Sequence, residues 1–481
     1  MKTNNAYQKI VLSLKRRRNG ATVADVCAAT ALPLSEVRDL LPKAADEYSG
    51  HLQVTQSGEI LYTFPNGFTS RYRGFQAMIN RFTQKGAAII KSAMVFLFKA
   101  WIMVMLIGYF VLFLALAVAS VFISAAARSS DNRRGGGFGG FNLFGLFWRI
   151  WFYSELTRPR YGYGRVTRRT GEKRPMHKAI FSFVFGDGDP NRDWEERESK
   201  AVIAYIQSNR GVISLAEYMA FSGKNSVEAE EAILSFCSRY GGSPEVTEQG
   251  TIVYRFDDLL LRADSKNFSE LSPPIKRLKT FSVNPKKLNG WFIAINAVNL
   301  VFGSYFLYNS FASGLLTTEV QYQAASYLYA FTHFLLNTIS ADPLGIIRVA
   351  LGFVPLVFSL FFWIIPAIRR FLESKENENI KLSNFKRLGF SKIWANPVNV
   401  ELSGLAQSAS ECSPKNIVEA ADRVIKDIGA ISTPEIESDE SGKTIYSFRE
   451  LVNEKQALKQ YRAGIDPSRT QLGETIFDSA E

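Results

Sequence analysis

The sequence predicts an α+β protein in which three small modules, each made of helices and a β-hairpin, alternate with transmembrane helices. The motif Gly-x-x-aliphatic-Tyr-x-Phe occurs three times, at Gly58–Phe64, Gly250–Phe256 and Gly442–Phe448, with a spacing of 192 residues. Each copy follows a stretch of helical periodicity, and long apolar segments lie between the copies. Repetition at a fixed spacing indicates that one structural unit is used three times.

The first module covers residues 1–66. A helix-like stretch at Ala6–Arg18 precedes two further helices, Thr22–Ala31 and Ser35–Tyr48. The last of these places its apolar residues at helical spacing, namely Val37, Leu40, Leu41 and Ala44. Two strands follow, joined by a glycine turn, at Leu52–Thr55 and Ile60–Phe64.

The other two modules repeat this order. In residues 181–265 the expected helices are Trp194–Asn209, Ser214–Phe221 and Ser226–Tyr240. In residues 396–450 we expect a helix over Val400–Ala409, and a second helix that Ser413-Pro414 caps and that runs to Ile428. The third hairpin has a longer acidic tip, Glu435–Glu440, and residues 451–481 are expected to form a flexible tail.

Three helices followed by a hairpin resemble the winged-helix fold, and in the first module the resemblance covers residues 6–65. The resemblance implies DNA binding through the third helix, which would need basic and amide side chains. The third helices carry many acids instead: Glu36, Asp39, Asp46 and Glu47; Glu228, Glu230 and Glu231; Glu419, Asp422 and Asp427. We therefore expect modules that bind a protein partner, which the sequence does not identify, or that form a homo-oligomer, and not modules that bind nucleic acid.

Three apolar segments are long enough to enter a membrane. The first covers residues 93–127, between basic linkers at 67–92 and 128–180. The second and third form a predicted hairpin at 288–370, between linkers at 266–287 and 371–395. Within this hairpin, 324–340 is too short for a comfortable span, and we interpret it as re-entrant or interfacial, with a full extra span as the alternative.

The distribution of charge predicts the topology. Lys286 and Lys287 precede the hairpin and Arg369 and Arg370 follow it, so the positive-inside rule places both ends in the cytoplasm. The first segment has basic residues at both ends, and a single span would separate modules one and two. A re-entrant path, or a second pass through 138–153, would keep them together, and we expect the three modules to share the cytoplasmic face of the cell membrane.

Basic residues around the first segment account for the net charge of +12. The aromatic stretch 138–153 is expected to lie in the membrane interface. Five arginines that follow it are expected to contact anionic lipid headgroups, with a nucleic-acid patch as the competing interpretation: Arg158, Arg160, Arg165, Arg168 and Arg169.

The sequence contains no recognisable catalytic motif and no metal-binding spacing of Cys and His residues. We therefore expect that the protein is not an enzyme and that it binds no cofactor or metal. The histidines His51, His177 and His333 are far apart in the sequence, in a hairpin, a basic linker and a membrane loop. Each module holds one cysteine, which indicates free, buried thiols in a reducing compartment: Cys27, Cys237 and Cys412.

The segment Phe181-Ser-Phe-Val-Phe-Gly-Asp-Gly-Asp-Pro-Asn191 has two interpretations. Acidic and amide residues at 187, 189, 191 and 198 have the spacing of a calcium loop, but Arg192 stands where such a loop needs glycine. The simpler interpretation is an apolar strand followed by a tight turn, with Asp193 capping the next helix. The segment also resembles one in uncharacterised multi-pass membrane proteins of bacteria and plastids, which implies no known activity.

Two amides lie on one face of the second apolar segment, Asn296 and Asn299. Amides at this spacing in a membrane usually contact neighbouring helices, so we expect a helix contact here. The whole sequence favours a multi-pass membrane scaffold or assembly protein that presents three modules for protein contact. The alternatives are a membrane-tethered DNA-binding regulator and a small transporter with soluble regulatory domains.

Overall fold

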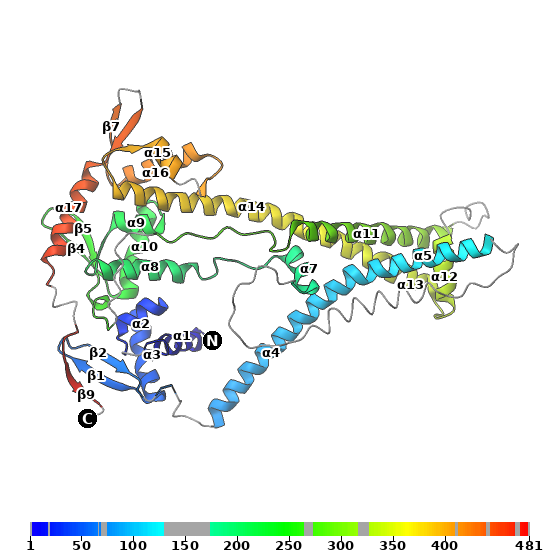
Figure 1. Ribbon diagram of the computed structural model, residues 1–481, viewed down its shortest axis with the longest axis horizontal. Coiled ribbons are helices and arrows are strands. Elements are labelled where there is room, and N and C mark those ends of the chain that lie inside the picture. Colours follow the sequence, from blue (N-terminus) through cyan, green and yellow to red (C-terminus); the bar gives the residue numbers. More distant parts are fainter. Residues whose placement is uncertain are drawn as a thin grey trace. The chain divides into compact units, whose positions relative to one another are not determined.

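The computed structural model is a mixture of helices and three small sheets, and it divides into two compact units (Figure 1). It describes residues 2–17, 20–65, 67–68, 75–128, 174–263, 273–315, 327–408, 412–438, 443–466 and 472–479. The first unit joins three segments, Met1–Arg81, Asp189–Lys279 and Lys375–Glu481, and the second unit contains Phe82–Gly188 and Thr280–Ser374. The first unit therefore holds all three copies of the repeated motif.

In the first module, three helices lead into a hairpin: α1 (Lys2–Leu14), α2 (Val23–Thr30), α3 (Leu34–Glu47), β1 (His51–Thr55) and β2 (Ile60–Thr63). Thr22 and Asp25 form a reciprocal capping box that starts α2. Gly58 turns the hairpin with a φ of +80°, a conformation that favours glycine. These elements are close to the expected ones, although α1 begins and ends four residues earlier than expected.

The second module has the same order with one short strand added: α8 (Trp194–Ser208), β3 (Val212–Ser214), α9 (Leu215–Ser222), α10 (Ser226–Tyr240), β4 (Ser243–Val246) and β5 (Ile252–Arg255). A 3-10 turn, η2 (Asp257–Leu259), follows the hairpin. Ser214 and Glu217 form the capping box of α9, at the positions 192 residues after Thr22 and Asp25. The expected helices are therefore present, with bounds that differ by one residue.

The third module departs most from expectation. Its elements are β6 (Val400–Glu401), α15 (Leu402–Ser408), α16 (Ile417–Gly429), β7 (Glu435–Ser438) and β8 (Thr444–Ser447). The expectation that Ser413-Pro414 caps the helix was wrong, because α16 begins three residues after Pro414 with Asn416 at its N-cap. The expectation of a flexible tail was also wrong, because α17 (Arg449–Gly464) and β9 (Thr475–Asp478) lie there. Buried Leu451 and Leu458 hold α17 to the core.

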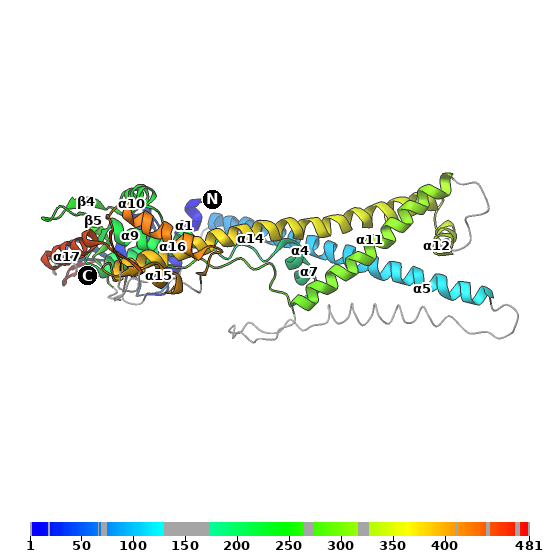
Figure 2. The ribbon, with the colours of Figure 1, turned by 90° about the horizontal axis from the view of Figure 1, so that it is seen from above.

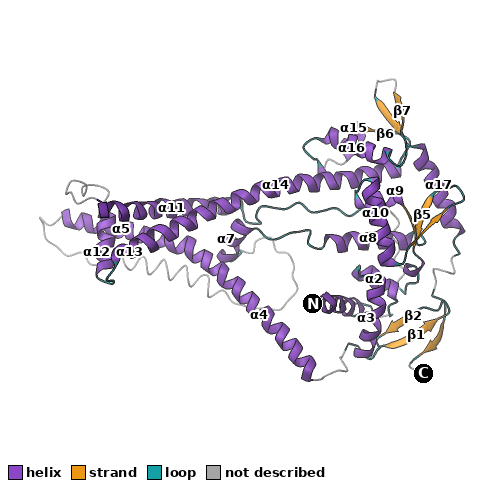
Figure 3. Ribbon diagram, turned by 180° about the vertical axis from the view of Figure 1, so that it is seen from behind, coloured by secondary structure: helices purple, strands orange, loops and turns teal. Residues whose placement is uncertain are grey.

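The repeated aromatic residues form part of one continuous core in the first unit. Tyr62 and Tyr254 are 4% exposed, and Phe256 and Phe448 are fully buried. Tyr and Phe two residues apart point to the same face of a strand, so each pair packs on its own helices. Because this core also contains residues of α14, α8 and α3, the three modules pack as one body (Figure 3).

The second unit is built from apolar helices, of which α4 begins and α14 ends within the residues of the first unit: α4 (Phe75–Met103), α5 (Tyr109–Arg128), α7 (Met176–Phe185), α11 (Lys286–Leu315), α12 (Tyr327–Asn337), α13 (Pro343–Ile346) and α14 (Val354–Ala395). Two stretches of π-helix interrupt them, η1 (Val104–Gly108) and η4 (Ile347–Phe353). Among the described residues, three helical stretches have the length and hydropathy to cross a membrane: Ile89–Ile123, Lys286–Ala312 and Pro343–Ala395. Figure 2 shows α11 approaching the start of α14. Just before α14, Gly352 of η4 lies against the backbone of Leu307 of α11.

Four smaller expectations were wrong. The segment before Gly186 is the helix α7 and not a strand, since its apolar residues pack on two sides against the long helices. His177 lies in this helix and not in a linker, where its ring contacts Phe96. Asp193 precedes α8 without capping it and pairs with Arg197 instead. In addition, 371–395 is no separate linker, because α14 continues through it.

Candidate functional site

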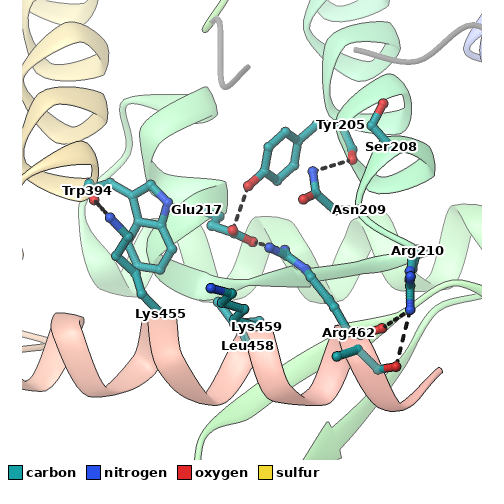
Figure 4. Close-up of a pocket in the computed structure, with 11 residues that line it drawn as sticks. Tyr205, Ser208, Asn209, Arg210, Glu217, Trp394, Lys455, Leu458, Lys459 and Arg462 are labelled. Carbon is teal, nitrogen blue, oxygen red and sulfur yellow. Dashed lines mark hydrogen bonds and ion pairs between the residues drawn. The ribbon is translucent and has the colours of Figure 1, made fainter. Parts of the chain in front are cut away.

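A cavity in the first unit lies between the second module and α17. It has a volume of about 540 Å³. Its walls come from the end of α8, from α9, from α14 at Trp394 and from one face of α17 (Figure 4). The lining is mostly polar and basic: Tyr205, Ser208, Asn209, Arg210, Glu217, Trp394, Lys455, Leu458, Lys459, Arg462 and Ala463.

A buried carboxylate, Glu217, organises one wall of this cavity. It accepts a hydrogen bond of 2.5 Å from the Tyr205 hydroxyl and one of 2.6 Å from Arg462 on α17. Burial and the neighbouring carboxylate raise the pKa of Tyr205 above its usual value, so this phenol stays protonated and donates. Arg462 also donates to the carbonyl oxygen of Val212, so one side chain ties α17 to both a helix cap and a strand.

Two of the other cations are engaged by carbonyl groups at helix ends. Arg210 donates to the carbonyl oxygens of Arg462, Ala463 and Ile465 at the end of α17. Lys455 donates to those of Trp394 and Ala395 at the end of α14. Cations at helix C-termini satisfy carbonyl groups that have no partner within the helix. Arg210 and Lys455 therefore join elements, and both Arg210 and Lys459 are exposed to solvent.

A second carboxylate lies next to the cavity. Glu454 on α17 is close to the Ser214 hydroxyl, the Ala216 amide and Glu217, and burial raises its pKa to about 7. Two carboxylates, Glu217 and Glu454, thus lie together at the start of α9, and Arg462 pairs with Glu217. Tyr205, Glu217 and Arg462 satisfy one another, so this group joins α17 to the second module.

The predicted intramembrane amides lie at contacts between the long helices of the second unit. Both side chains are fully buried. Asn296 donates to the Ser359 carbonyl oxygen of α14 at 2.9 Å, and Asn299 donates to the Leu106 carbonyl oxygen of η1 at 2.7 Å. A π-helix shifts its own hydrogen bonds and offers carbonyl groups to neighbouring side chains. Tyr109 makes the corresponding contact to Ala350 of η4.

The five predicted lipid-contacting arginines, Arg158, Arg160, Arg165, Arg168 and Arg169, lie outside the described residues, as does the aromatic stretch 138–153. The end of the same basic segment is described, and Arg174 pairs with Asp187 at 2.7 Å. That pairing, a hydrogen bond from Ser182 and one from the Val283 amide lower the pKa of Asp187, although its partial burial acts in the opposite direction.

Arg369 was expected only as a topology determinant, and it has a structural role that the sequence did not reveal. It donates to the carbonyl oxygens of Phe183 at the end of α7 and of Phe281, and its guanidinium lies 4.2 Å from the Phe281 ring centre. Gly186 has a φ of +81°, and a side chain there would collide with Arg369. The Phe181–Asn191 segment is therefore a helix end and turn held by an arginine.

The four residues of the suggested calcium loop are each engaged by other groups. Ser182 donates to Asp187, the Asn191 amide donates to Asp189, and Arg387 pairs with Glu198 at 2.9 Å. Within the described part of the chain, no group of three or more His, Cys, Asp or Glu side chains is placed to hold a metal ion. The three cysteines are free and buried.

Asparagine side chains hold an extended segment of the first unit that lies within the expected linker 266–287. Asn384 donates to the carbonyl oxygen of Lys276 and accepts from its amide, and Asn377 does the same for Lys279. Asn191 pairs with Arg277 in the same way. Asn377 and Asn384 are seven residues apart on α14, so they share one face. That heptad spacing was the only sign of this contact in the sequence.

Comparison with known proteins yields one relative of unknown role. The chain is 27% identical over 429 residues to an uncharacterized chloroplastic protein of Arabidopsis thaliana, a match that covers 84% of this chain and 75% of the relative. No family model matches the chain. No solved structure matches it either.

Proposed function

We propose that the protein is a multi-pass membrane scaffold or assembly factor whose three modules are winged helices that bind other proteins. The observation that carries this proposal is the common core of the first unit, which joins three similar modules into one body. Tyr240 donates to the Ala31 carbonyl oxygen, Thr22 to that of Leu261, and Arg462 to Glu217. A rigid body of several modules suits the binding of protein surfaces.

The exposed helix faces favour protein over DNA. On α10, the third helix of the second module, Glu228, Glu230 and Glu231 are exposed, together with the apolar Val227 and Leu234. Exposed carboxylates would repel phosphates, and DNA-binding helices need cations at such positions. On α3, Arg38 is engaged by Asp258 of the second module at 3.0 Å.

The packing of modules one and two also supports their location on one side of the membrane. A span at Ile89–Ile123 lies between them, and one crossing alone would leave them on opposite sides. Modules that share a core lie on one side of a membrane, which supports a path that returns to that side before Asp189. We therefore favour the second pass or the re-entrant path; the stretch 138–153 and the arginines predicted to contact anionic lipid lie outside the described residues.

The cysteines indicate the compartment in which the modules lie. Free, buried cysteines suit a reducing compartment, so we place the modules on the cytoplasmic face of the membrane. The relative is chloroplastic. The membrane-tethered DNA-binding regulator remains the alternative, and it differs from the scaffold in a way that one experiment can measure.

Site-specific photocrosslinking tests the proposal. A photoreactive residue at Val227 or Leu234 on the exposed face of α10, and another at Val418 (71% exposed) on α16, should give discrete protein adducts in intact cells. The adducts should resist nuclease. Crosslinks to nucleic acid in place of protein, or salt-sensitive retention on DNA, would instead support the regulator. The matched control is the same residue at buried Ile233, which should give no adduct.

A further inference from the structure

The first strand of the hairpin has a different environment at its outer edge in each of the three modules. The strand orders are β2-β1-β9, β3-β5-β4 and β6-β8-β7, so β1, β4 and β7 are corresponding strands. In the second and third modules the corresponding strand lies at the edge of its sheet. An exposed edge offers unpaired amide and carbonyl groups to another strand, and proteins usually protect it.

The repeat shows which residues face outward on each edge. Thr55 and Thr247 bond back to their own hairpins, through the carbonyl oxygens of Glu59 and Thr251. Alternation in an antiparallel pair then turns the amides of residues 52 and 54 outward on β1, and of 244 and 246 on β4. The third sheet has the same alternation of inward and outward amides as the second. The Phe448 amide donates to the carbonyl oxygen of Pro397, just as the Phe256 amide donates to that of Gly211. On β7 the outward residues are Ile436 and Ser438.

The first edge is occupied by the C-terminal strand of this chain. The Ser479 amide donates to the Leu52 carbonyl oxygen, and the Gln56 amide donates to that of Glu474. Gln53 donates to the Asp478 carboxylate at 2.7 Å. Ile476 and Phe477 of β9 are 68% and 59% exposed, so backbone bonds and the pair Gln53–Asp478 hold the strand. The edge of this module type can therefore accept an added strand.

The second edge is blocked. Pro244 stands at an outward position of β4, where it has no amide hydrogen to donate. In addition, Tyr461 of α17 donates to Glu245 on the same strand. A proline and a bound side chain at the middle of a four-residue strand leave little room for pairing.

The third edge is open in the described part of the chain. All four residues of β7 are exposed, with Ile436 at 67%, and neither outward residue is a proline. Glu435 pairs with Arg449, whereas Glu437 has no ion pair among the described residues. Glu437 corresponds to Gln53, the residue that binds Asp478 in the first module. An amide side chain at this position, such as Gln53, can pair with an acidic side chain on the added strand. A carboxylate, such as Glu437, favours a basic side chain there.

We infer that the β7 edge of the third module is a docking edge that binds an extended, basic peptide segment by strand addition. Main-chain bonds to Ile436 and Ser438 supply the affinity, and Glu437 selects a lysine or arginine opposite it. This inference rests on the proposed function and names the mode of contact and the chemistry of the partner. An acidic segment such as β9 is disfavoured here by like charge.

The test uses the full-length protein in detergent and a labelled ten-residue peptide that alternates threonine and lysine, with blocked ends. We expect saturable binding that weakens at high salt. Ile436→Pro, which copies Pro244, should weaken binding at least tenfold, because it removes an outward amide and no bond to β8. Ile436→Val keeps that amide and should bind as the wild type does. Glu437→Gln should reduce the preference for lysine over glutamate peptides.

A second arm leaves the protein unchanged. The same lysine peptide is prepared with N-methyl groups on alternate residues, so that the amide groups along one edge of the peptide can no longer donate hydrogen bonds. It should bind at least tenfold more weakly. Equal binding of the methylated peptide, equal binding to the proline variant, or no binding of the lysine peptide would each overturn the inference. Photocrosslinks to protein elsewhere on the modules, together with such a result, would leave the scaffold proposal standing while removing this edge from it.

Discussion

At the scale of single residues, the repeated aromatic side chains explain why the motif occurs three times. Tyr254 is 4% exposed and packs with Phe236 and Phe256 in the common core. Ile252, two residues before it on the same strand, is 55% exposed. Each copy of the motif therefore places at least one aromatic side chain in the core: Tyr62 in the first, Tyr254 and Phe256 in the second, and Phe448 in the third.

Replacing Tyr254 by alanine should destabilise the protein by about 2–4 kcal/mol, because a large side chain is lost from a packed core. Urea unfolding of the full chain in detergent, followed by tryptophan fluorescence, measures the loss. Ile252→Ala is the matched control and should cost less than about 1 kcal/mol. Similar losses for the two variants would show that the tyrosine is not a core residue.

Glu454 should make stability depend on pH. Burial raises its pKa to about 7, above the ordinary value of 4.5, so the folded protein binds this proton more tightly than the unfolded chain does. Stability should therefore fall as pH rises from about 4.5 to about 7 and then level off, by at most about 3 kcal/mol.

Glu454→Gln should remove most of this dependence and raise the stability at pH 8. The control is Glu230→Gln, a change at an exposed carboxylate of α10. Melting temperatures of the three proteins between pH 5 and pH 8 make the comparison. Parallel curves for wild type and Glu454→Gln would contradict the assignment of this acid.

At the scale of elements, the helices that are started by capping residues close in sequence could be predicted. The capping pairs Thr22–Asp25 and Ser214–Glu217 start α2 and α9, close to where the expected helices begin. The polar α17 was missed because only a few residues, such as Leu451 and Leu458, bury it, and Arg462 ties it to a module far away in sequence. Alternating apolar residues did not separate helix from strand in α7.

The asparagine contacts along α14 were also beyond sequence reasoning, because an amide that pairs with a distant backbone resembles any surface asparagine. Asn384→Ala should remove both bonds to Lys276 and speed hydrogen exchange of that amide at least tenfold. Exchange followed by mass spectrometry on peptides covering 273–281 reports the change. Asn396→Ala, at an exposed position just after α14, should leave those peptides unaltered. Unchanged exchange in Asn384→Ala would mean that the segment is held by other contacts.

At the scale of the whole molecule, the fold class and the apolar segments could be predicted, and the candidate cavity could not. Length and hydropathy identify the three candidate spans, although the helical stretch of the third continues past the expected end at residue 370 to Ala395. The cavity brings together residues near 210, 394 and 460, which no local pattern relates. Whether modules one and two share a side depends on their packing, and the scaffold proposal depends on the same point.

Cysteine accessibility measures this point most directly. The native cysteines are buried, so single cysteines can be introduced at exposed positions of each module, Leu12, Val227 and Val418, and within residues 316–326, which the topology prediction assigns to the outer loop. In intact cells, an impermeant maleimide should label the loop and none of the modules, and after permeabilisation it should label all four sites. Labelling of Leu12→Cys and Val227→Cys from opposite sides of the membrane would contradict the account, because modules that share a core cannot lie on different faces.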